Sequence, residues 1–451
     1  MKILIANGFS DNLRASEDWP GWWVQRVIWF ASDGDILILP SAADRSFMDY
    51  ATKLIGVDLE SLSILILPPQ VVGDRRVPFV ERLTNADFKV ALSTAMAGRN
   101  VHEIFALWPD AALADFARSI DASDAMPGLS FLSQDGGRLV NSKSVFRAIA
   151  AGLRVPIPDG AVCQSHQELH KAIKSLFDIS DTVIVKQDYM TGGAGNVIFT
   201  SGQTFDPVGA RAVVQTPTDY SVAEYVEAHW EELCGRRGDR VVVERYHRDS
   251  RAAFAEFSIQ EGSVTLGGTG ELLSAPFACA QVMPPVGFEG DAMALIESNG
   301  MRLAECMATL GFRGRLSADA IVTPQGEVFF TEYNGRVTGS THIYAIIGDR
   351  IIGSGFGHDR IILERIWPDG WRVGSFGAAR DSVFEAGLAF DPNTRTGVVF
   401  TNAYNAQSQG VMYCIAAPDI LSARQIERHL AELFAVDTNA RLPPLPIEGF
   451  E

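Results

Sequence analysis

Short apolar runs alternate with longer amphipathic stretches in the first third of the chain. We expect buried strands in the apolar runs and helices in the intervals between them, such as 47–55 and 79–97. Strands that alternate with helices predict an open α/β sheet. The expected strands are residues 2–6, 35–40, 62–69 and 103–108.

The first expected strand is not followed by a glycine-rich dinucleotide turn. Its continuation reads NGFSDN over 7–12, without the GxGxxG spacing that brings a backbone close to a pyrophosphate. The first domain is therefore predicted to be Rossmann-like but without a dinucleotide site.

The pattern changes near residue 140. Ser142 is a predicted N-cap for a helix through Ala151, and Gly152 ends that helix. From about 381, two apolar runs and one amphipathic stretch predict a small α+β segment, followed by a loosely held proline-rich tail. Between these regions the pattern predicts a helix from Ser165, strands at 182–187 and 240–246, helices near 219–234 and 291–310, and a hairpin over 316–334.

The hairpin carries the first candidate chemistry. If Pro324 and Gln325 are the central pair of its turn, Asp319 lies opposite Phe330, and Glu332 and Asn334 share its face. Asp319 and Glu332 are then diagonal neighbours roughly 7–8 Å apart. Such a set of oxygen ligands suits Mg²⁺. A solvated hairpin end explains the same residues equally well, and a three-residue loop would turn Asp319 to the other face.

Two lysines and a glycine cluster form a second candidate. Lys186 closes a run of apolar β-formers, where an ammonium group is costly unless an anion lies nearby. Gly192, Gly193 and Gly195 follow on a short loop whose backbone N–H groups can turn toward phosphates, although a flexible turn is the alternative. Lys143 lies in the first turn of a predicted helix, where the helix dipole disfavours a cation.

These segments, together with Glu244 at the end of the strand 240–246, resemble the ATP-grasp ligases over residues 140 to 350. The resemblance implies that Lys143 and Lys186 hold ATP phosphates, that the glycine loop covers them, and that Glu244 lies at the adenine and ribose. It also assigns Mg²⁺, usually two ions with Mn²⁺ as a substitute, to Asp319, Glu332 and Asn334. Arg336 matches an arginine that contacts the γ-phosphate or the substrate carboxyl group.

The chain departs from the family pattern at two places. Ser317 stands where many relatives carry an arginine, so we expect Arg315 or Arg313 to replace it. A second acidic residue for the ribose is not evident, and Asp249 is one candidate. Ser340 and His342, just beyond the hairpin, are candidate substrate contacts. Within the family, the overall architecture looks most like the pheganomycin-type peptide ligases.

The resemblance therefore predicts an α/β fold, α+β in parts, with three domains. They are a Rossmann-like pre-ATP-grasp domain at 1–140, a two-lobed ATP-grasp domain at 141–380, and a small α+β domain at 381–451. The implied reaction joins a small-molecule carboxylate to an amine or a peptide N-terminus through an acyl phosphate, with ADP and phosphate released. A dipeptide or amino-acid ligase, and a kinase that stops after phosphorylation, remain alternatives.

Composition narrows the partners and the cellular location that we expect for the protein. The 451 residues include 55 acidic and 38 basic side chains, for a net charge of -17, which disfavours nucleic acid and anionic membranes as partners. The five cysteines form no CxxC pair, and no apolar run approaches the about 20 residues of a membrane span. We expect a cytoplasmic protein with reduced thiols, and the resemblance allows a homodimer.

Overall fold

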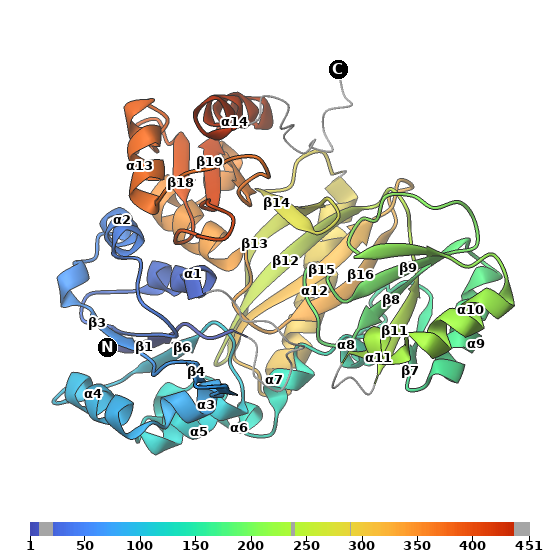
Figure 1. Cartoon of the computed structure of the whole chain (residues 1–451), viewed down its shortest axis with the longest axis horizontal. Coiled ribbons are helices and arrows are strands. Elements are labelled where there is room, and N and C mark those ends of the chain that lie inside the picture. The colour runs from blue at the N-terminus through green and yellow to red at the C-terminus, as the bar shows by residue number, and fades with distance from the viewer. Residues whose placement is uncertain (9–20, 236–239, 289, 437–451) are drawn as a thin grey trace.

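The computed structural model describes residues 1–8, 21–235, 240–288 and 290–436 (Figure 1). The predicted loose tail at 441–451 and most of the loop over 7–12 lie outside these ranges. Three sheets organise the described chain: a four-stranded sheet, a five-stranded sheet and an eight-stranded sheet.

The first sheet is parallel throughout and confirms the predicted open α/β start. Its order is β3-β2-β1-β6, formed by Ser63–Ile66, Ile36–Leu39, Lys2–Ile5 and Glu103–Ala106. Ile3 pairs with both Ile36 and Ile104, and all three side chains are buried. Burial on both faces is why the two central strands are apolar over residues 3–5 and 36–39. The main helices beside it are α2 (Arg45–Ile55), α4 (Ala86–Met96) and α5 (Ala111–Ser119).

The second sheet has the order β10-β9-β8-β11-β7 and contains the predicted strands 182–187 and 240–246. Its strands are β7 (Gly160–Cys163), β8 (Thr182–Gln187), β9 (Asn196–Thr200), β10 (Ala212–Gln215) and β11 (Val241–Arg245). The helices α9 (His166–Phe177), α10 (Asp219–Ala228) and α11 (Trp230–Cys234) contribute buried side chains to the same core. The single helix expected near 219–234 is thus two helices.

The third sheet has the order β16-β15-β12-β13-β14-β17-β19-β18. Its strands are β12 (Arg251–Gln260), β13 (Ser263–Ser274), β14 (Ala278–Met283), β15 (Gly314–Val322), β16 (Val328–Asn334), β17 (Ile361–Arg365), β18 (Gly397–Phe400) and β19 (Tyr413–Ala417). The helix α12 (Gly290–Thr309) packs against β12 and β15.

The C-terminal segment belongs to this third sheet. Ile362 of β17 pairs with Met283 on one side and with Ala416 of β19 on the other. The predicted boundary at 380/381 falls inside α13 (Phe376–Glu385), and α14 (Ile420–Phe434) packs on β19. The C-terminal strands β18 and β19 therefore extend the third sheet, because the hydrogen-bonding edge of β17 is completed by β19.

Shorter elements connect these layers. They are α1 (Gly21–Val24), α3 (Phe79–Leu83), α6 (Leu129–Leu132), α7 (Gly136–Leu139), α8 (Lys143–Gly152), strands β4 (Val71–Val72) and β5 (Arg75–Arg76), the 3₁₀ turns Gln25–Phe30, Leu59–Ser61, Ser123–Ala125 and Phe356–His358, and a π-helix over Ile343–Gly353. In the described part of the chain, no helix combines the length and the apolarity needed to cross a membrane.

A buried charge cluster fastens α14 to the third sheet and gives a stability prediction. Glu427 is fully buried between Arg365 Nε at 2.7 Å and Arg424 Nη1 at 2.5 Å. Glu427→Gln removes the carboxylate that faces both buried guanidinium groups, so we expect a loss of roughly 3–5 kcal/mol in unfolding free energy. Urea denaturation measures it.

Glu432→Gln, at an exposed position of the same helix, is the control. It should change the unfolding free energy by no more than about 0.5 kcal/mol. Equal midpoints for the two variants would contradict the role given to the cluster.

Candidate functional site

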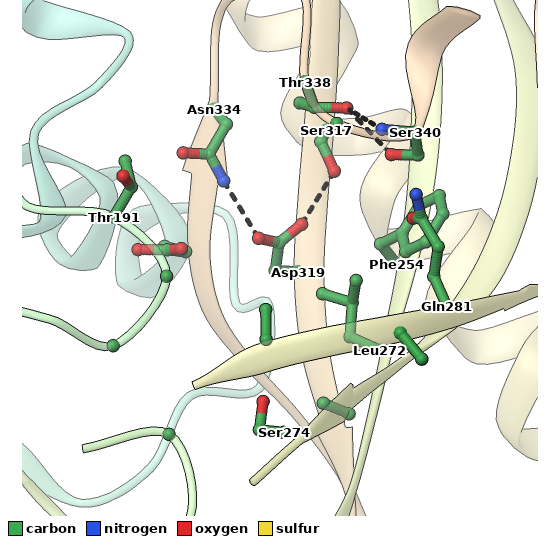
Figure 2. A pocket seen from close by; sticks show the side chains of 18 of the residues that line it. Thr191, Phe254, Leu272, Ser274, Gln281, Ser317, Asp319, Asn334, Thr338 and Ser340 are labelled. Atoms are coloured by element: carbon green, nitrogen blue, oxygen red, sulfur yellow. Dashed lines mark hydrogen bonds between the residues drawn. The ribbon is translucent and has the colours of Figure 1, made fainter. Parts of the chain in front are cut away.

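A cavity of about 510 Å³ lies on one face of the third sheet (Figure 2). The hairpin β15–β16 forms one wall through Asp319, Glu332 and Asn334, and the loop after β8 forms another through Thr191, Gly192 and Gly193. Trp23 and Trp108, from the N-terminal region, also line it. The cavity therefore collects residues from distant parts of the chain.

The hairpin brings Asp319 and Glu332 together by a different register from the predicted one. Val322 pairs with Val328, so the loop is one residue longer than expected, and Asp319 lies directly opposite Glu332 rather than opposite Phe330. The longer loop alone would put the two carboxylates on opposite faces, but a bulge next to Asp319 shifts the register again. The two irregularities cancel, so the shared face was predicted correctly from an incorrect register.

Asp319 is held by neutral donors. Ser317 Oγ donates to Asp319 Oδ1 at 2.7 Å, and Asn334 Nδ2 donates to Oδ2 at 2.9 Å (Figure 2). Burial and the nearby Glu332 carboxylate raise the pKa of Asp319 to about 7. Ser317, which stands where relatives carry an arginine, thus supports Asp319 by a hydrogen bond and adds no charge.

Glu332 lies among three cations. Lys143 Nζ is 2.8 Å from Glu332 Oε2. Burial would raise the pKa of Glu332, but Lys143, Lys186 and Arg336 outweigh it and lower this pKa. In this pair of carboxylates, the raised pKa of Asp319 favours its protonated form and the lowered pKa of Glu332 favours its charged form.

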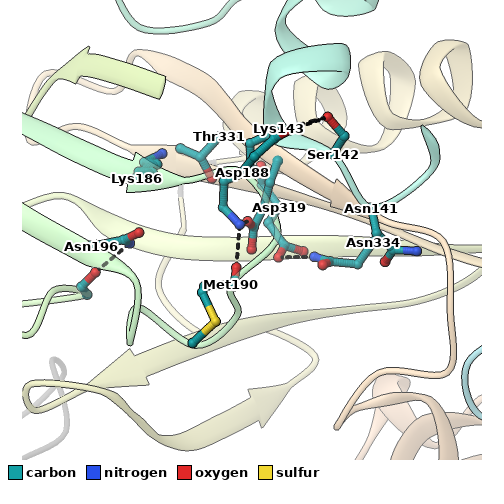
Figure 3. A network of polar contacts seen from close by, with 12 residues as sticks. Asn141, Ser142, Lys143, Lys186, Asp188, Met190, Asn196, Asp319, Thr331 and Asn334 are labelled. Atoms are coloured by element: carbon teal, nitrogen blue, oxygen red, sulfur yellow. Dashed lines mark hydrogen bonds and ion pairs between the residues drawn. The ribbon is translucent and has the colours of Figure 1, made fainter. Parts of the chain in front are cut away.

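Lys143 begins α8, as predicted, with Ser142 as the N-cap (Figure 3). Ser142 Oγ accepts from the Val145 N–H, and Lys143 Nζ donates to the Met190 carbonyl. Glu332 supplies the negative charge that a cation at a helix N-terminus requires.

Glu244 forms a second buried charge cluster. Its carboxylate lies 2.5 Å from Lys186 Nζ and 2.6 Å from Arg147 Nη1, and only 1% of the residue is exposed. Glu244 and the two lysines are not among the residues that line the cavity, although Lys143 contacts Glu332, which does line it. Sequence reasoning missed Arg147, although its position one helical turn after Lys143 was a usable signal.

The glycine loop depends most on Gly193. Gly193 has a φ of +84°, and a Cβ there would lie 2.7 Å from the Gly209 carbonyl oxygen, so only glycine fits. Gly192 and Gly193 line the cavity, whereas Gly195 does not and packs against Met190. Asp249, the candidate ribose partner, is exposed with a φ of +58°.

Arg336 lines the cavity beside the carboxylates. Its Nη1 donates to Asn141 Oδ1 at 2.5 Å, and its guanidinium lies 4.1 Å from the Trp108 ring centroid. Arg315 and Arg313 are not among the residues that line this cavity, and both line a second one of about 570 Å³ that Arg336 also lines. The expectation that one of them replaces the missing arginine beside Asp319 is therefore not met by this geometry.

The two candidate substrate contacts differ. Ser340 lines the cavity, and its Oγ donates to Glu256 Oε2 at 3.3 Å. His342 is fully buried away from the cavity lining, where burial and the nearby Arg26 hold its pKa well below its usual value. His342 therefore cannot touch a substrate in this cavity.

Glu256 was missed from the sequence. This fully buried carboxylate accepts from the hydroxyl groups of Thr338 at 2.8 Å, of Thr341 at 2.5 Å and of Tyr344 at 3.1 Å. It fixes the loop that follows Arg336, so its role is to hold one wall of the cavity in place.

The hairpin residues fit a hard divalent cation. Among the described residues, no group of three or more histidine, cysteine, aspartate and glutamate side chains is placed to hold a metal ion. The proposed set differs from such a group because it combines two carboxylates with the Asn334 amide. Asp319 and Glu332 face each other on paired strands, and a bound cation would offset both the burial and the repulsion from Glu332 that raise the pKa of Asp319.

Two family models match separate parts of the chain. The first, described as the pre ATP-grasp domain, matches residues 24–122. The second, described as the PGM1 C-terminal domain, matches residues 378–430. No curated protein sequence matches the chain.

Solved structures resemble nearly the whole chain at low sequence identity. Biotin carboxylase from Campylobacter jejuni is 14% identical with a TM-score of 0.58, over 96% of this chain and 91% of that one. N5-carboxyaminoimidazole ribonucleotide synthetase from Thermus thermophilus is 12% identical with a TM-score of 0.57, over 98% and 100%.

An L-amino acid ligase from Bacillus licheniformis is 11% identical, with a TM-score of 0.54 over 96% of this chain and 97% of that one. The chain has the ATP-grasp fold. The mixed α/β architecture predicted from the sequence is thereby confirmed. In this ATP-grasp fold, the second and third sheets carry the cavity and the charge clusters around Glu332 and Glu244.

The carboxylate pair predicts how stability depends on pH without metal. Because the folded pKa of Asp319, about 7, lies above its ordinary value of 3.8, the folded protein holds a proton that the unfolded chain releases between these values. Stability in a chelator should therefore fall as pH rises from about 4 to 7. Asp319→Asn should remove this fall, on the order of 1–3 kcal/mol, in urea titrations at several pH values.

Magnesium should stabilise the unmodified protein at pH 8 more than it stabilises Asp319→Asn. The exposed Asp369→Asn serves as the control and should follow the unmodified protein. If Asp319→Asn and the unmodified protein show the same pH profile, repulsion at the hairpin is not the cause.

Proposed function

We propose that this protein is an ATP-dependent carboxylate–amine ligase that forms an amide bond and releases ADP and phosphate. One observation carries the proposal: Lys143, Lys186 and Arg336, from three separate elements, all act electrostatically on Glu332 at the wall of the cavity. Three buried cations around two carboxylates suit a polyphosphate with its divalent cation.

The charge clusters suggest how ATP would bind. Lys143 and Lys186 now pair with Glu332 and Glu244, and each can exchange its carboxylate for a phosphate oxygen. Asp319, Glu332 and Asn334 would hold magnesium, which neutralises charge on the phosphates when bound. The loop at Gly192 and Gly193 would cover the phosphates from the opposite wall.

The residues of the chain support a two-step reaction. A carboxylate oxygen of the acid substrate attacks the γ-phosphorus, and the bond from that phosphorus to the bridging oxygen of ADP breaks. The amine then attacks the acyl carbon, phosphate leaves, and the amine loses its proton to solvent or to the departing phosphate. Arg336 would neutralise the transferred group, and the walls of the cavity would exclude water.

The finer proposal concerns the substrates. We infer that the protein joins an amino acid or a derivative to the N-terminus of a peptide, as in the pheganomycin-type ligases. The resemblance to an L-amino acid ligase supports amino-acid chemistry and keeps a dipeptide ligase as an alternative. The proposed division at 140 and 380, the cytoplasmic location and a homodimer belong to the same proposal. One neighbour is a biotin carboxylase domain dimer.

Glu332→Gln tests the reaction. The change keeps the shape of the side chain but removes the charge that faces Lys143 and a bound metal, so we expect ligation to fall by at least about 100-fold. The assay incubates the protein with ATP, magnesium, amino acids and peptides, and mass spectrometry detects products lighter than the sum by one water. The exposed Glu327→Gln, in the loop of the same hairpin, should keep its activity.

Release of ADP with a phosphorylated acid and no condensed product, even when amines are present, would favour the kinase alternative. Unchanged ligation by Glu332→Gln would exclude the proposed metal set.

A further inference from the structure

The far end of the cavity contains a buried carboxylate that the proposed reaction does not use. Glu364 of β17 lines the cavity and is only 4% exposed. It accepts hydrogen bonds from the Gln281 amide and, at 3.4 Å, from Thr401 Oγ1. No ion pair joins Glu364 to any of the residues that the structure describes.

Three other buried glutamates, in different parts of the protein, form ion pairs. Glu271 pairs with Arg251 at 2.7 Å, Glu427 lies between two arginines, and Glu244 lies between Lys186 and Arg147. Glu256 has no ion pair either, but hydroxyl groups surround it and it does not line the cavity. Glu364 therefore differs from them because it lines the cavity and forms no direct ion pair with a described residue.

Arg26 acts electrostatically on Glu364, but no ion pair joins the two residues, and Arg26 Nε and Nη2 have no hydrogen-bond partner among the described residues. Its Nη1 donates to the Trp23 carbonyl at 3.1 Å, and its guanidinium lies 3.2 Å from the Trp23 ring centroid. Burial raises the pKa of Glu364 to about 7 despite Arg26, Gln281 and Thr401. The carboxylate thus lacks the stabilisation that a cation in contact would give.

The sheet fixes where Glu364 lies relative to the reacting end. Paired positions run across five strands through Ile321, Ala252, Leu272, Gln281 and Glu364, and all five residues line the cavity. Asp319 shares its strand and face with Ile321. Four strand spacings of about 4.8 Å separate the rows of Asp319 and Glu364 by about 19 Å.

This separation identifies the kind of group that could bind. The attacking amine must be neutral and must reach the acyl carbon beside the hairpin carboxylates, so Glu364, four strands from Asp319, cannot hold it. Between the two ends the cavity is lined by apolar side chains, including Phe254, Leu272 and Ala280, and Ile366 and Met412 line it at the Glu364 end. Ile366 is 48% exposed, so a long substrate could continue outward at this end.

We propose that Glu364, with Gln281 beside it, binds a protonated amine or guanidinium group on one of the two substrates, remote from the bond that forms. This inference rests on the proposed ligase function and adds a substrate class to it: elongated molecules with an apolar stem and a distal cation. Glu364 is then a specificity-determining residue.

Matched peptides test the inference. Tripeptides that differ only by arginine against citrulline, or by lysine against norleucine, separate guanidinium from ammonium recognition. Calorimetry with magnesium and a non-hydrolysable ATP analogue measures their binding, and mass spectrometry with ATP measures ligation. We expect the unmodified protein to prefer at least one cationic member by about 10-fold or more, and Glu364→Gln to bring that ratio close to one.

Two further variants keep the result interpretable. Glu271→Gln removes a buried, paired carboxylate from the same sheet and should keep the ratio. Ile366→Lys puts a fixed cation at an exposed position on the face of Glu364 and should lower the ratio, even if Glu364→Gln fails to fold.

The failures of the two proposals are distinguishable. Binding without charge preference, a preference that survives both Glu364→Gln and Ile366→Lys, or no binding by any cationic peptide would overturn the cation site. Condensed products formed without charge preference would leave the ligase proposal standing. Charge-selective binding without any condensed product would support the cation site and argue against the ligase.

Discussion

The candidate site depends on ion pairs between buried lysines and glutamates, each of which can exchange its counter-charge. Lys143 and Lys186 are compensated inside the protein because Glu332 and Glu244 lie within 2.8 Å of them. The same ion pairs compensate the two carboxylates. A polyphosphate with its cation can replace both partners of these ion pairs, because its oxygens can bind the lysines and its metal can bind the carboxylates.

The hairpin shows why its shared face could be predicted and its register could not. Alternation of side chains along a strand is local, so Glu332 and Asn334 had to share a face unless a bulge intervened. Loop length and bulges are settled by pairing with neighbours, and β15 is held on its other side by β12, where Asp319 faces Phe254. The sequence around the turn contains no comparable information.

Much of the fold followed from apolar runs, since buried parallel strands such as Lys2–Ile5 have few alternatives. Contacts between distant segments did not follow. Arg147, Glu256 and Glu364 look ordinary in the sequence, and their importance arises from what the fold places beside them. The expectation that His342 contacts a substrate has the opposite problem. His342 is close to the hairpin in the sequence, but this does not decide whether its side chain faces the cavity or is buried away from it.

The continuity of the third sheet connects these observations. Because β17 and β19 extend the sheet that holds Asp319, the wall between the reacting end and Glu364 is hydrogen-bonded throughout, and its length is set by the number of strands. A hinge between two domains would let that distance vary. A continuous sheet holds it nearly constant, as selection by substrate length requires. The opposite wall is different, because the glycine loop belongs to the second sheet, so closure there could adapt to ATP without disturbing the distance along the third sheet.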